Sequence, residues 1–293
     1  MCSFLGVAEG VPDKCRVAKY QWQGDSPVNS CLHGSVRYVS YWENPPGQVM
    51  PAYVALALVS MRRALGERFL LLTPGTVLDL IDPRILGKAW AFEPLPFTLA
   101  KGIEAIVAKS DFIRMAFVHR HGGAWVDADT LFLRDPTSAL FPAGLSHKLH
   151  WHSECIFASQ PGNPLLARAL ATGLEGGAHC WGNPGRIKDI VAQSADELVP
   201  IAGDVVDPGY RPRYNFASCE VMRRQDVSVA DFLVTDATML KLYNTYFRRT
   251  ARRMESVEEF LSGGTLLAKL FLHIEADPGY WLGESERLIE AVC

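Results

Sequence analysis

The sequence predicts an α/β fold in which a mostly parallel sheet is flanked by helices. Short segments of strand composition alternate along the chain with longer segments of helical spacing, which is the pattern of βαβ units. A chain of 293 residues with 48% hydrophobic and 21% charged residues has the composition of a globular protein with a full core. No internal repeat or low-complexity tract interrupts this alternation.

The first part of the chain predicts a βαβ unit behind an irregular leader. Residues 1–34 mix Pro, Gly, Asp and Cys without periodicity, so we expect a leader there and a single domain over residues 35–293. Residues 36–42 alternate and have the composition of a strand. Pro51 then opens a helix to about residue 65, and residues 69–72 form a second short strand. This order predicts two parallel neighbours in one sheet.

The middle of the chain predicts a long helix followed by the central strand. Apolar residues at helical spacing predict a helix over residues 101–121, and they are Ile103, Ile106, Val107, Ile113, Ala116 and Phe117. Gly122 and Gly123 end this helix, because glycine adopts the left-handed conformation that often follows a helix. Residues 124–126 have strand character, and Asp127-Ala128-Asp129 follows them directly.

The carboxylates of Asp127 and Asp129 predict a cation site. Residues i and i+2 of an extended segment point to one side, and open α/β sheets bind ligands beyond the carboxyl ends of their strands. Two adjacent carboxylates repel each other unless a cation or a proton lies between them. Divalent metals that also hold phosphates use one or two carboxylates and leave positions for substrate oxygens. The pattern therefore predicts a metal–diphosphate site at the end of a central strand.

The remaining elements are predicted from periodicity and from Gly and Pro breakers. We expect a short helix at 76–81, a loop at 83–96 and a loose glycine-rich segment at 176–185. Further extended segments are expected at 131–133, 149–151 and 155–158. Further helices are expected at 164–174, 187–198, 237–247 and 257–271.

Composition and charge limit the classes of function. A net charge of −3 offers no general attraction for nucleic acid or an anionic membrane. Seven scattered cysteines without a C-x-x-C pair favour reduced thiols in a cytoplasmic protein over a secreted disulfide framework. Residues 1–10 lack the pattern of a signal peptide, and the longest apolar run, residues 52–61, is too short to span a bilayer. We therefore expect no transmembrane segment.

A longer motif surrounds the two aspartates. The signature S-D-x-x-R-x(7)-G-G-x-[YW]-x-D-x-D is matched in register by Ser110, Asp111, Arg114, Gly122, Gly123, Trp125, Asp127 and Asp129. This stretch resembles a group of glycosyltransferases that includes capsular polysaccharide synthesis proteins, the mannosyltransferases of family 32 and the catalytic domain of large glucosylating toxins. The resemblance is strong over the motif and looser from Tyr38 to about Leu166. Membrane anchors are usual in the fungal relatives, and this chain departs from them there.

The resemblance implies the GT-A fold and a role for each acidic residue. Asp129 would ligate Mn²⁺ or Mg²⁺ on the donor diphosphate, and Asp127 would reach the ribose or the metal. Asp111 would accept hydrogen bonds from the donor sugar, while Arg114 would hold sugar or phosphate oxygens. Without the motif, Asp111 and Arg114 are simply an i,i+3 salt bridge on the surface of a helix. The donor would be a UDP- or GDP-linked sugar, bound by residues 35–140, with the acceptor in residues 141–293.

Three further residues complete the expected donor site. Ser110 belongs to the same donor-binding set, and Trp42 resembles the aromatic that stacks on the nucleotide base, although a tryptophan at a strand end is more often core. His273, with Trp281 downstream, resembles the late His and Trp of family 32, which implies a contact with the metal or the diphosphate. A histidine after an apolar helix is more often structural, and the serine that usually precedes the tryptophan is absent. We expect residues 262–281 to close over the donor as a lid.

The sequence predicts a metal-dependent transfer of a hexose from a nucleotide diphosphate sugar to an acceptor hydroxyl, with retention of configuration. The acceptor is a glycan, as in polysaccharide biosynthesis, a small molecule or a protein. Two alternatives stay open: an aspartyl-phosphate phosphohydrolase with Asp127 as nucleophile, and an inactive module that binds sugar nucleotides.

Two clusters outside the motif carry weaker signals. One is basic, and it is either a solvated helix face or a contact for an anionic acceptor or membrane surface: Arg248, Arg249, Arg252 and Arg253. The other consists of His147, His150 and His152, for which we expect acceptor-side polar contacts rather than a metal.

Overall fold

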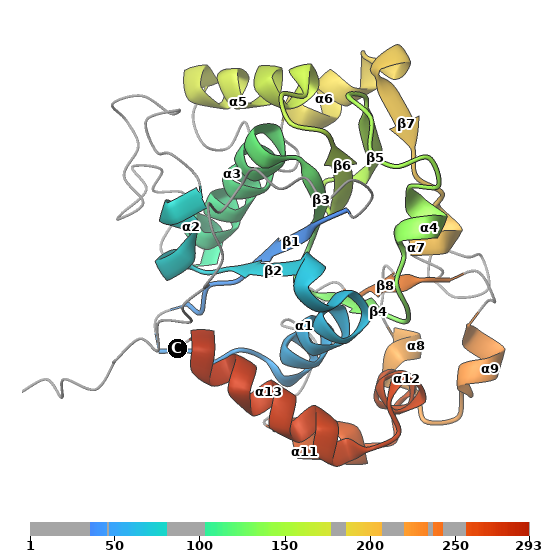
Figure 1. The fold of residues 1–293 in the computed structure, drawn as a ribbon. Helices are drawn as coiled ribbons and strands as arrows, with labels where there is room; N and C mark the ends of the chain where they lie inside the picture. The colour runs from blue at the N-terminus through green and yellow to red at the C-terminus, as the bar shows by residue number, and fades with distance from the viewer. Residues whose placement is uncertain are drawn as a thin grey trace, which may run out of the picture. The chain divides into compact units, whose positions relative to one another are not determined.

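A six-stranded sheet in the order β2-β1-β3-β6-β5-β7 forms the centre of this computed structural model (Figure 1). Its strands are β1 (Tyr38–Tyr41), β2 (Phe69–Leu72), β3 (Gly123–Val126), β5 (Leu149–Ser153), β6 (Ile156–Ser159) and β7 (Leu198–Pro200). The structure describes residues 36–45, 47–80, 103–176, 186–206, 220–233, 237–242 and 256–292. Pairing is parallel for β1–β2, β1–β3 and β5–β7 and antiparallel for β3–β6 and β5–β6. The predicted α/β class with a mostly parallel sheet is confirmed, and the sheet is mixed.

The predicted βαβ unit is confirmed. β1 and β2 pair from Tyr38↔Phe69 to Tyr41↔Leu72, and α1 (Ala52–Leu65) and the 3-10 turn η1 (Gly66–Arg68) connect them. Pro51 precedes the helix, where its missing N–H costs no hydrogen bond. Gly66 ends α1 with φ of 57°, a conformation that glycine adopts without steric cost.

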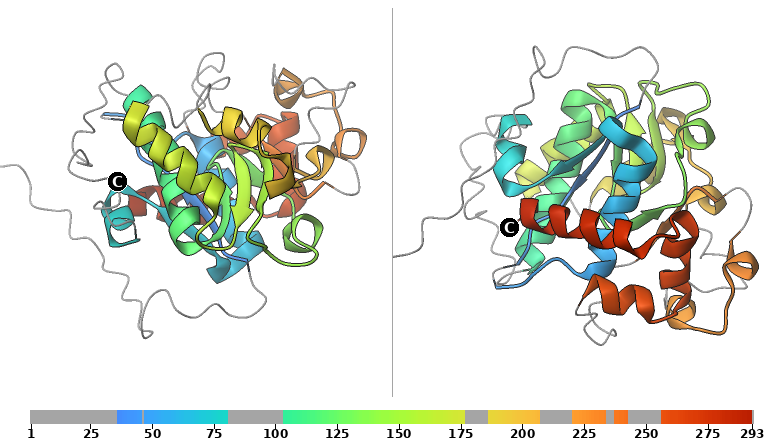
Figure 2. Two further views of the ribbon diagram at one scale, coloured as in Figure 1. Left: turned by 90° about the horizontal axis from the view of Figure 1, so that it is seen from above. Right: turned by 60° about the horizontal axis from the view of Figure 1, so that its bottom comes forward.

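Side chains of the sheet alternate between two apolar layers. Tyr38, Ala124 and Val126 face a layer built by α1 and the C-terminal helices, whereas Val39 and Trp125 face a layer built on α3 (Ile103–His121), α5 (Pro164–Gly176) and α6 (Arg186–Ala192). Figure 1 and the two views of Figure 2 show α3 and α5 on one side of the sheet and α1 and α13 (Pro278–Val292) on the other. The sheet is therefore covered on both faces, as a largely parallel sheet requires.

The second half of α3 is buried on nearly all sides. Phe112, Ile113, Ala116 and Phe117 are all buried, because α3 lies between the sheet and α5. Val107 was predicted to lie on the apolar face but is 52% exposed, so that part of the prediction was wrong.

A second, two-stranded sheet follows the central strand. β4 (Thr130–Phe132) pairs antiparallel with β8 (Met239–Lys241), with Thr130 opposite Lys241. The predicted helix at 237–247 is wrong over its described part, residues 237–242, which contains β8. A short apolar run does not distinguish a helix from a strand, and pairing with β4 decides here for the strand.

The C-terminal part consists of three helices packed against α1. The predicted helix at 257–271 is divided by Gly263 and Gly264 into α11 (Val257–Ser262) and α12 (Leu266–Ile274), and α13 was not predicted. The predicted helix at 187–198 is shorter, because α6 is followed by the 3-10 turn η4 (Ala195–Glu197) and strand β7. The remaining helices of the described ranges are α2 (Pro74–Leu80), α4 (Thr137–Leu140), α7 (Gly203–Val206), α8 (Glu220–Arg223) and α9 (Val229–Phe232).

Several expectations concern residues outside the described ranges. These are the leader at 1–34, the loop at 83–96, most of the segment at 176–185 and the four arginines from Arg248 to Arg253. Cys155, the described cysteine, carries a free thiol. Within the described ranges, the helices are either too short or too polar to cross a bilayer.

Candidate functional site

The carboxyl ends of β1 and β3 meet at one edge of the sheet, because the two strands are parallel neighbours. Trp42 and Glu43 follow β1, and Asp127 follows β3. Helix α3 reaches the same edge, since Lys109 Nζ lies 2.7 Å from Glu43 Oε2. Tyr41 donates its hydroxyl to the same Glu43 oxygen at 2.5 Å. Two strands and one helix therefore meet at the edge of the sheet that carries Asp127.

Two glycines set the path from α3 into β3. Gly122 and Gly123 have φ of 68° and 102°. A Cβ on Gly122 would lie 2.7 Å from Pro161 Cδ, and one on Gly123 would lie 2.7 Å from the carbonyl oxygen of Arg37. The same Arg37 oxygen accepts the amide of Ala124 at 2.8 Å. Both glycines are thus required by backbone conformation and by close packing.

The carboxylates of Asp127 and Asp129 converge on the ammonium of Lys241. Nζ lies 2.8 Å from Asp127 Oδ2 and also contacts Asp129 Oδ1. Trp125 donates its indole N–H to the other Asp127 oxygen at 2.8 Å, and the Asp127 amide donates to the carbonyl of Cys155. Burial would raise the pKa of Asp127, but the charges of Lys241 and Arg114 outweigh it and hold the pKa below its ordinary value. The two aspartates therefore face one cation position.

Asp111 and Arg114 form a buried ion pair on the inner side of α3. Arg114 Nη2 lies 2.6 Å from Asp111 Oδ1, and the two residues are 6% and 9% exposed, respectively. The pair is therefore not a surface salt bridge. Burial raises the pKa of Asp111 to about 6, although Arg114 opposes the shift, and the charges of Asp127 and Glu154 add to it. Burial would lower the pKa of Arg114, but Asp111 and Asp127 raise it, so the guanidinium stays charged.

The turn between β5 and β6 closes the site from a third direction. It carries Glu154, which is buried and acts electrostatically on Arg114, and Cys155. Burial first, and then the charge of Asp127, raises the pKa of the Cys155 thiol to about 12, so this thiol stays protonated and is a poor nucleophile. Four carboxylates, those of Asp111, Asp127, Asp129 and Glu154, face the cations of Arg114 and Lys241. This cluster, called the charged cluster below, has a formal excess of two negative charges.

Trp42 and Ser110 lie on the elements that frame the charged cluster. Trp42 is half-buried, packs partly against the core and donates its indole N–H to Asn44 Oδ1 at 2.8 Å. Ser110 is half-buried on α3, between Lys109 and Asp111. Both side chains are therefore partly exposed.

The structure does not bring His273 together with the two aspartates. His273 is exposed in the last turn of α12, whose other face buries Phe271 in the core. Trp281 is also core, because it packs edge-on against Phe271 and donates its indole N–H to the carbonyl of Glu275. Within the described part of the chain, no three His, Cys, Asp or Glu residues are grouped so that they could hold a metal. The predicted lid at 262–281 is built from α11, α12 and the start of α13, which pack on α1.

The three histidines make local contacts. His150 is buried, accepts the amide of Ser146 and packs edge-on against Phe141. His152 bonds to Ser153, and the carbonyl of the exposed His147 accepts from Asn163. These contacts suit structural residues.

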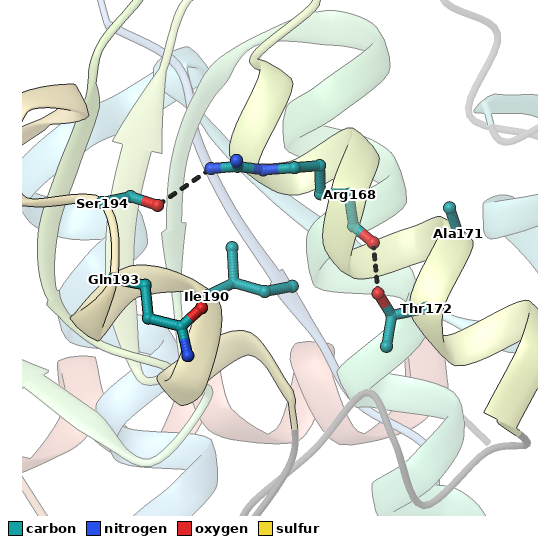
Figure 3. Close-up of a pocket in the computed structure, with 6 residues that line it drawn as sticks. All are labelled: Arg168, Ala171, Thr172, Ile190, Gln193 and Ser194. Carbon is teal, nitrogen blue, oxygen red and sulfur yellow. Dashed lines mark hydrogen bonds between the residues drawn. The ribbon is translucent and has the colours of Figure 1, made fainter.

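A separate hollow of about 390 Å³ lies between α5 and α6 (Figure 3). Arg168 lines it and donates to Ser194 Oγ at 2.9 Å and to Glu197 at 3.1 Å. Thr172 donates to the Arg168 carbonyl, and Ile190 supplies an apolar wall (Figure 3). The hollow is lined by no residue of the charged cluster, and the charged residue in its lining, Arg168, is already paired with Glu197.

Comparison with known proteins returns no match, either to a protein-family model or to a curated protein. The functional argument therefore depends on the motif and on the geometry of the charged cluster.

Sequence reasoning missed Lys241, which contacts both aspartates. It was assigned to a predicted helix, and it lies 112 residues after Asp129. Its signal was a charged residue within the apolar run Met239-Leu240-Lys241-Leu242. A lysine in a buried strand requires a buried counter-charge.

Proposed function

We propose that this protein is a metal-dependent glycosyltransferase that moves a hexose from a UDP- or GDP-linked sugar to an acceptor hydroxyl. The observation that carries the proposal is the convergence of Asp127 and Asp129 on one cation at the carboxyl end of a central strand. Open α/β sheets bind their ligands at that edge. The motif from Ser110 to Asp129 adds the specific class and the finer expectation of a GT-A fold.

Asp127 and Asp129 suit a divalent ion that takes two carboxylates from the protein and leaves its other positions to substrate oxygens. Their oxygen donors converge on a positive charge, that of Lys241, and hard divalent metals prefer such oxygens. The formal excess of two negative charges is what one divalent ion would neutralise. Asp127 and Asp129 would hold Mn²⁺ or Mg²⁺, which when bound would stabilise negative charge on the leaving diphosphate.

Asp111 and Arg114 would bind the donor. A buried guanidinium presents its donors in a fixed fork, which matches phosphate or sugar oxygens. Preorganised positive charge in a site of low polarity stabilises the departing diphosphate more than it would in water. Trp42 would offer its exposed part to the base, and Ser110 would contribute a hydroxyl to the donor. Retention of configuration and a cytoplasmic location remain part of this proposal.

The phosphohydrolase alternative is less well supported. It requires a nucleophilic Asp127, but one oxygen of that carboxylate accepts from Trp125 and the other from Lys241. Its motif is also expected after the first strand of the fold, whereas Asp127 follows β3.

The test is a screen of UDP- and GDP-sugars for Mn²⁺-dependent hydrolysis, which requires no knowledge of the acceptor. Wild type should release nucleoside diphosphate from at least one donor, and Asp129→Asn should lose at least tenfold of that turnover with unchanged circular dichroism. Asp135→Asn, a change to an exposed acid between β4 and α4, is the matched control. Metal-independent release, or full turnover by Asp129→Asn, would refute the site.

A further inference from the structure

Lys241 already holds the carboxylate oxygens that a metal would use. Its ammonium contacts Oδ2 of Asp127 at 2.8 Å and Oδ1 of Asp129. Burial alone would lower the pKa of Lys241, but Asp127 and Asp129 raise it well above its ordinary value, so the side chain is a permanent cation.

Backbone hydrogen bonds hold Lys241 in strand β8 and limit the positions that its ammonium can reach. Lys241 pairs with Thr130 across the small sheet, and the amide of Leu242 donates to the carbonyl of Asp129 at 2.7 Å. The side chain is buried, with 7% of the residue exposed. An ammonium without an anionic partner is costly at such a position. If the carboxylates of Asp127 and Asp129 were taken by another cation, Lys241 would need a new anion within reach of its stem.

We propose that Lys241 is a tethered cation that competes with a divalent metal for Asp127 and Asp129 and turns to the diphosphate when the metal binds. Two cations that share the same oxygens repel each other, so a bound metal displaces the ammonium from at least one carboxylate. Diphosphate oxygens beside the metal are the nearest anions that the proposed function supplies. The identity of this second anion rests on the proposed function, whereas the competition with metal does not.

This arrangement makes metal and nucleoside diphosphate cooperative ligands. Metal alone must displace Lys241 without giving it a new partner, so its affinity is low. Metal with diphosphate supplies that partner, so each ligand raises the affinity of the other by the same factor. A lysine that only stabilises the fold would leave this linkage unchanged when it is removed.

The experiment compares wild type with Lys241→Met, which keeps most of the stem and removes the charge. Lys269→Met is the matched control, because Lys269 Nζ donates to backbone carbonyls of Gln225 and Val227 and not to the two aspartates. Mn²⁺ binding without nucleotide is measured by calorimetry and by the electron paramagnetic resonance of free Mn²⁺. UDP and GDP binding is then measured at saturating Mn²⁺.

In K241M we expect Mn²⁺ alone to bind at least tenfold more tightly than in wild type, and the diphosphate to bind at least tenfold more weakly. K269M should match wild type in both. Unchanged Mn²⁺ affinity in K241M overturns the competition. If K241M binds Mn²⁺ more tightly but binds the diphosphate with unchanged affinity, Lys241 does not contact the diphosphate, and that part of the proposal is wrong.

Lys241→Met also removes the ammonium that contacts Asp127 and Asp129, so this variant is expected to unfold at a lower temperature. Mn²⁺ should then raise its melting temperature by more than that of wild type. If K241M does not fold, Lys241→Gln, which keeps a hydrogen-bond donor without the charge, is measured in the same way and judged by the same outcomes.

The result separates this inference from the proposed function. Tighter Mn²⁺ binding by K241M, with no binding of either diphosphate to wild type, supports the tethered cation and contradicts the glycosyltransferase. Mn²⁺-dependent donor hydrolysis by wild type, with unchanged Mn²⁺ affinity in K241M, supports the glycosyltransferase and contradicts the tethered cation.

Discussion

The ammonium of Lys241 lies 2.8 Å from Oδ2 of Asp127, a residue 114 positions earlier in the chain. The contact joins the end of the central strand β3 to the small sheet β4–β8, which starts with Thr130 just after Asp129. The predicted cation position is therefore assembled by pairing between two segments that are remote in sequence.

Asp111→Ala should weaken turnover of the nucleotide sugar at least tenfold more than binding of the bare diphosphate. The reason is that its expected partners are sugar hydroxyls, and a hydrogen bond to a charged group contributes about 1.5–3 kcal/mol. Calorimetry with UDP and GDP beside a donor-hydrolysis assay measures the two effects. If donor turnover and diphosphate affinity fall by the same factor, Asp111 only positions Arg114 and does not bind the sugar.

The stability contribution of Asp111 should fall as pH rises from about 4 to about 6. Its pKa is raised to about 6 by burial, against an ordinary value of 3.8. An acid with a raised pKa stabilises the fold fully below the lower value and loses this contribution as pH passes the upper one. Two pKa units correspond to about 3 kcal/mol.

Urea unfolding of wild type and Asp111→Asn across this pH range checks the effect. The variant has no carboxyl at this position, so its stability relative to that of wild type should increase as the pH rises from about 4 to about 6. A difference that stays constant from pH 4 to 7 would show that burial does not shift the pKa of Asp111.

Gly123→Ala should destabilise the protein far more than Gly66→Ala. Both glycines have positive φ, but a Cβ on Gly66 meets nothing within 4 Å, whereas one on Gly123 lies 2.7 Å from the Arg37 carbonyl oxygen. Conformational strain alone costs about 1–3 kcal/mol, and Gly123→Ala adds a clash with the backbone of Arg37, the residue before β1. Urea midpoints measure both variants, and equal losses would leave conformation as the sole role of Gly123.

Ser60→Ala should cost about 1–3 kcal/mol of stability, because it leaves a buried amide without its acceptor. Ser60 Oγ accepts the Phe132 amide at 2.9 Å and donates to the Ala57 carbonyl at 2.6 Å, so it ties α1 to β4. Ser262→Ala is the control, since the exposed Ser262 hydroxyl donates to the Glu259 carbonyl of its own helix. If Ser60→Ala lowers the free energy of unfolding no more than Ser262→Ala does, the hydrogen bond from Phe132 to Ser60 does not stabilise the contact between α1 and β4.

Local pattern was enough to predict the frame of the candidate site. The alternation of residues 36–42 predicted β1, and the strand character of residues 124–126 predicted β3. The spacing along α3 predicted its length, and Gly122-Gly123 predicted its end. Each of these features depends on residues that are close in sequence. The expected extended path through Asp127 and Asp129 is wrong, because β3 ends at Val126 and Ala128 and Asp129 lie in a turn. Both carboxylates nevertheless contact Lys241, so their common direction comes from this contact and not from strand alternation.

Tertiary structure alone decided which charges the site contains and how deeply they lie. The spacing of Asp111 and Arg114, without the motif, indicates only a surface salt bridge, whereas packing of α3 between the sheet and α5 buries the pair. The sequence pattern placed Lys241 in a predicted helix, whereas pairing of β8 with β4 makes it the cation that both aspartates contact. The resemblance implied that His273 contacts the metal or the diphosphate, whereas burial of the apolar face of α12 places His273 on the surface. Burial and ion pairing depend on which segments pack together, and those contacts have no local period in the sequence.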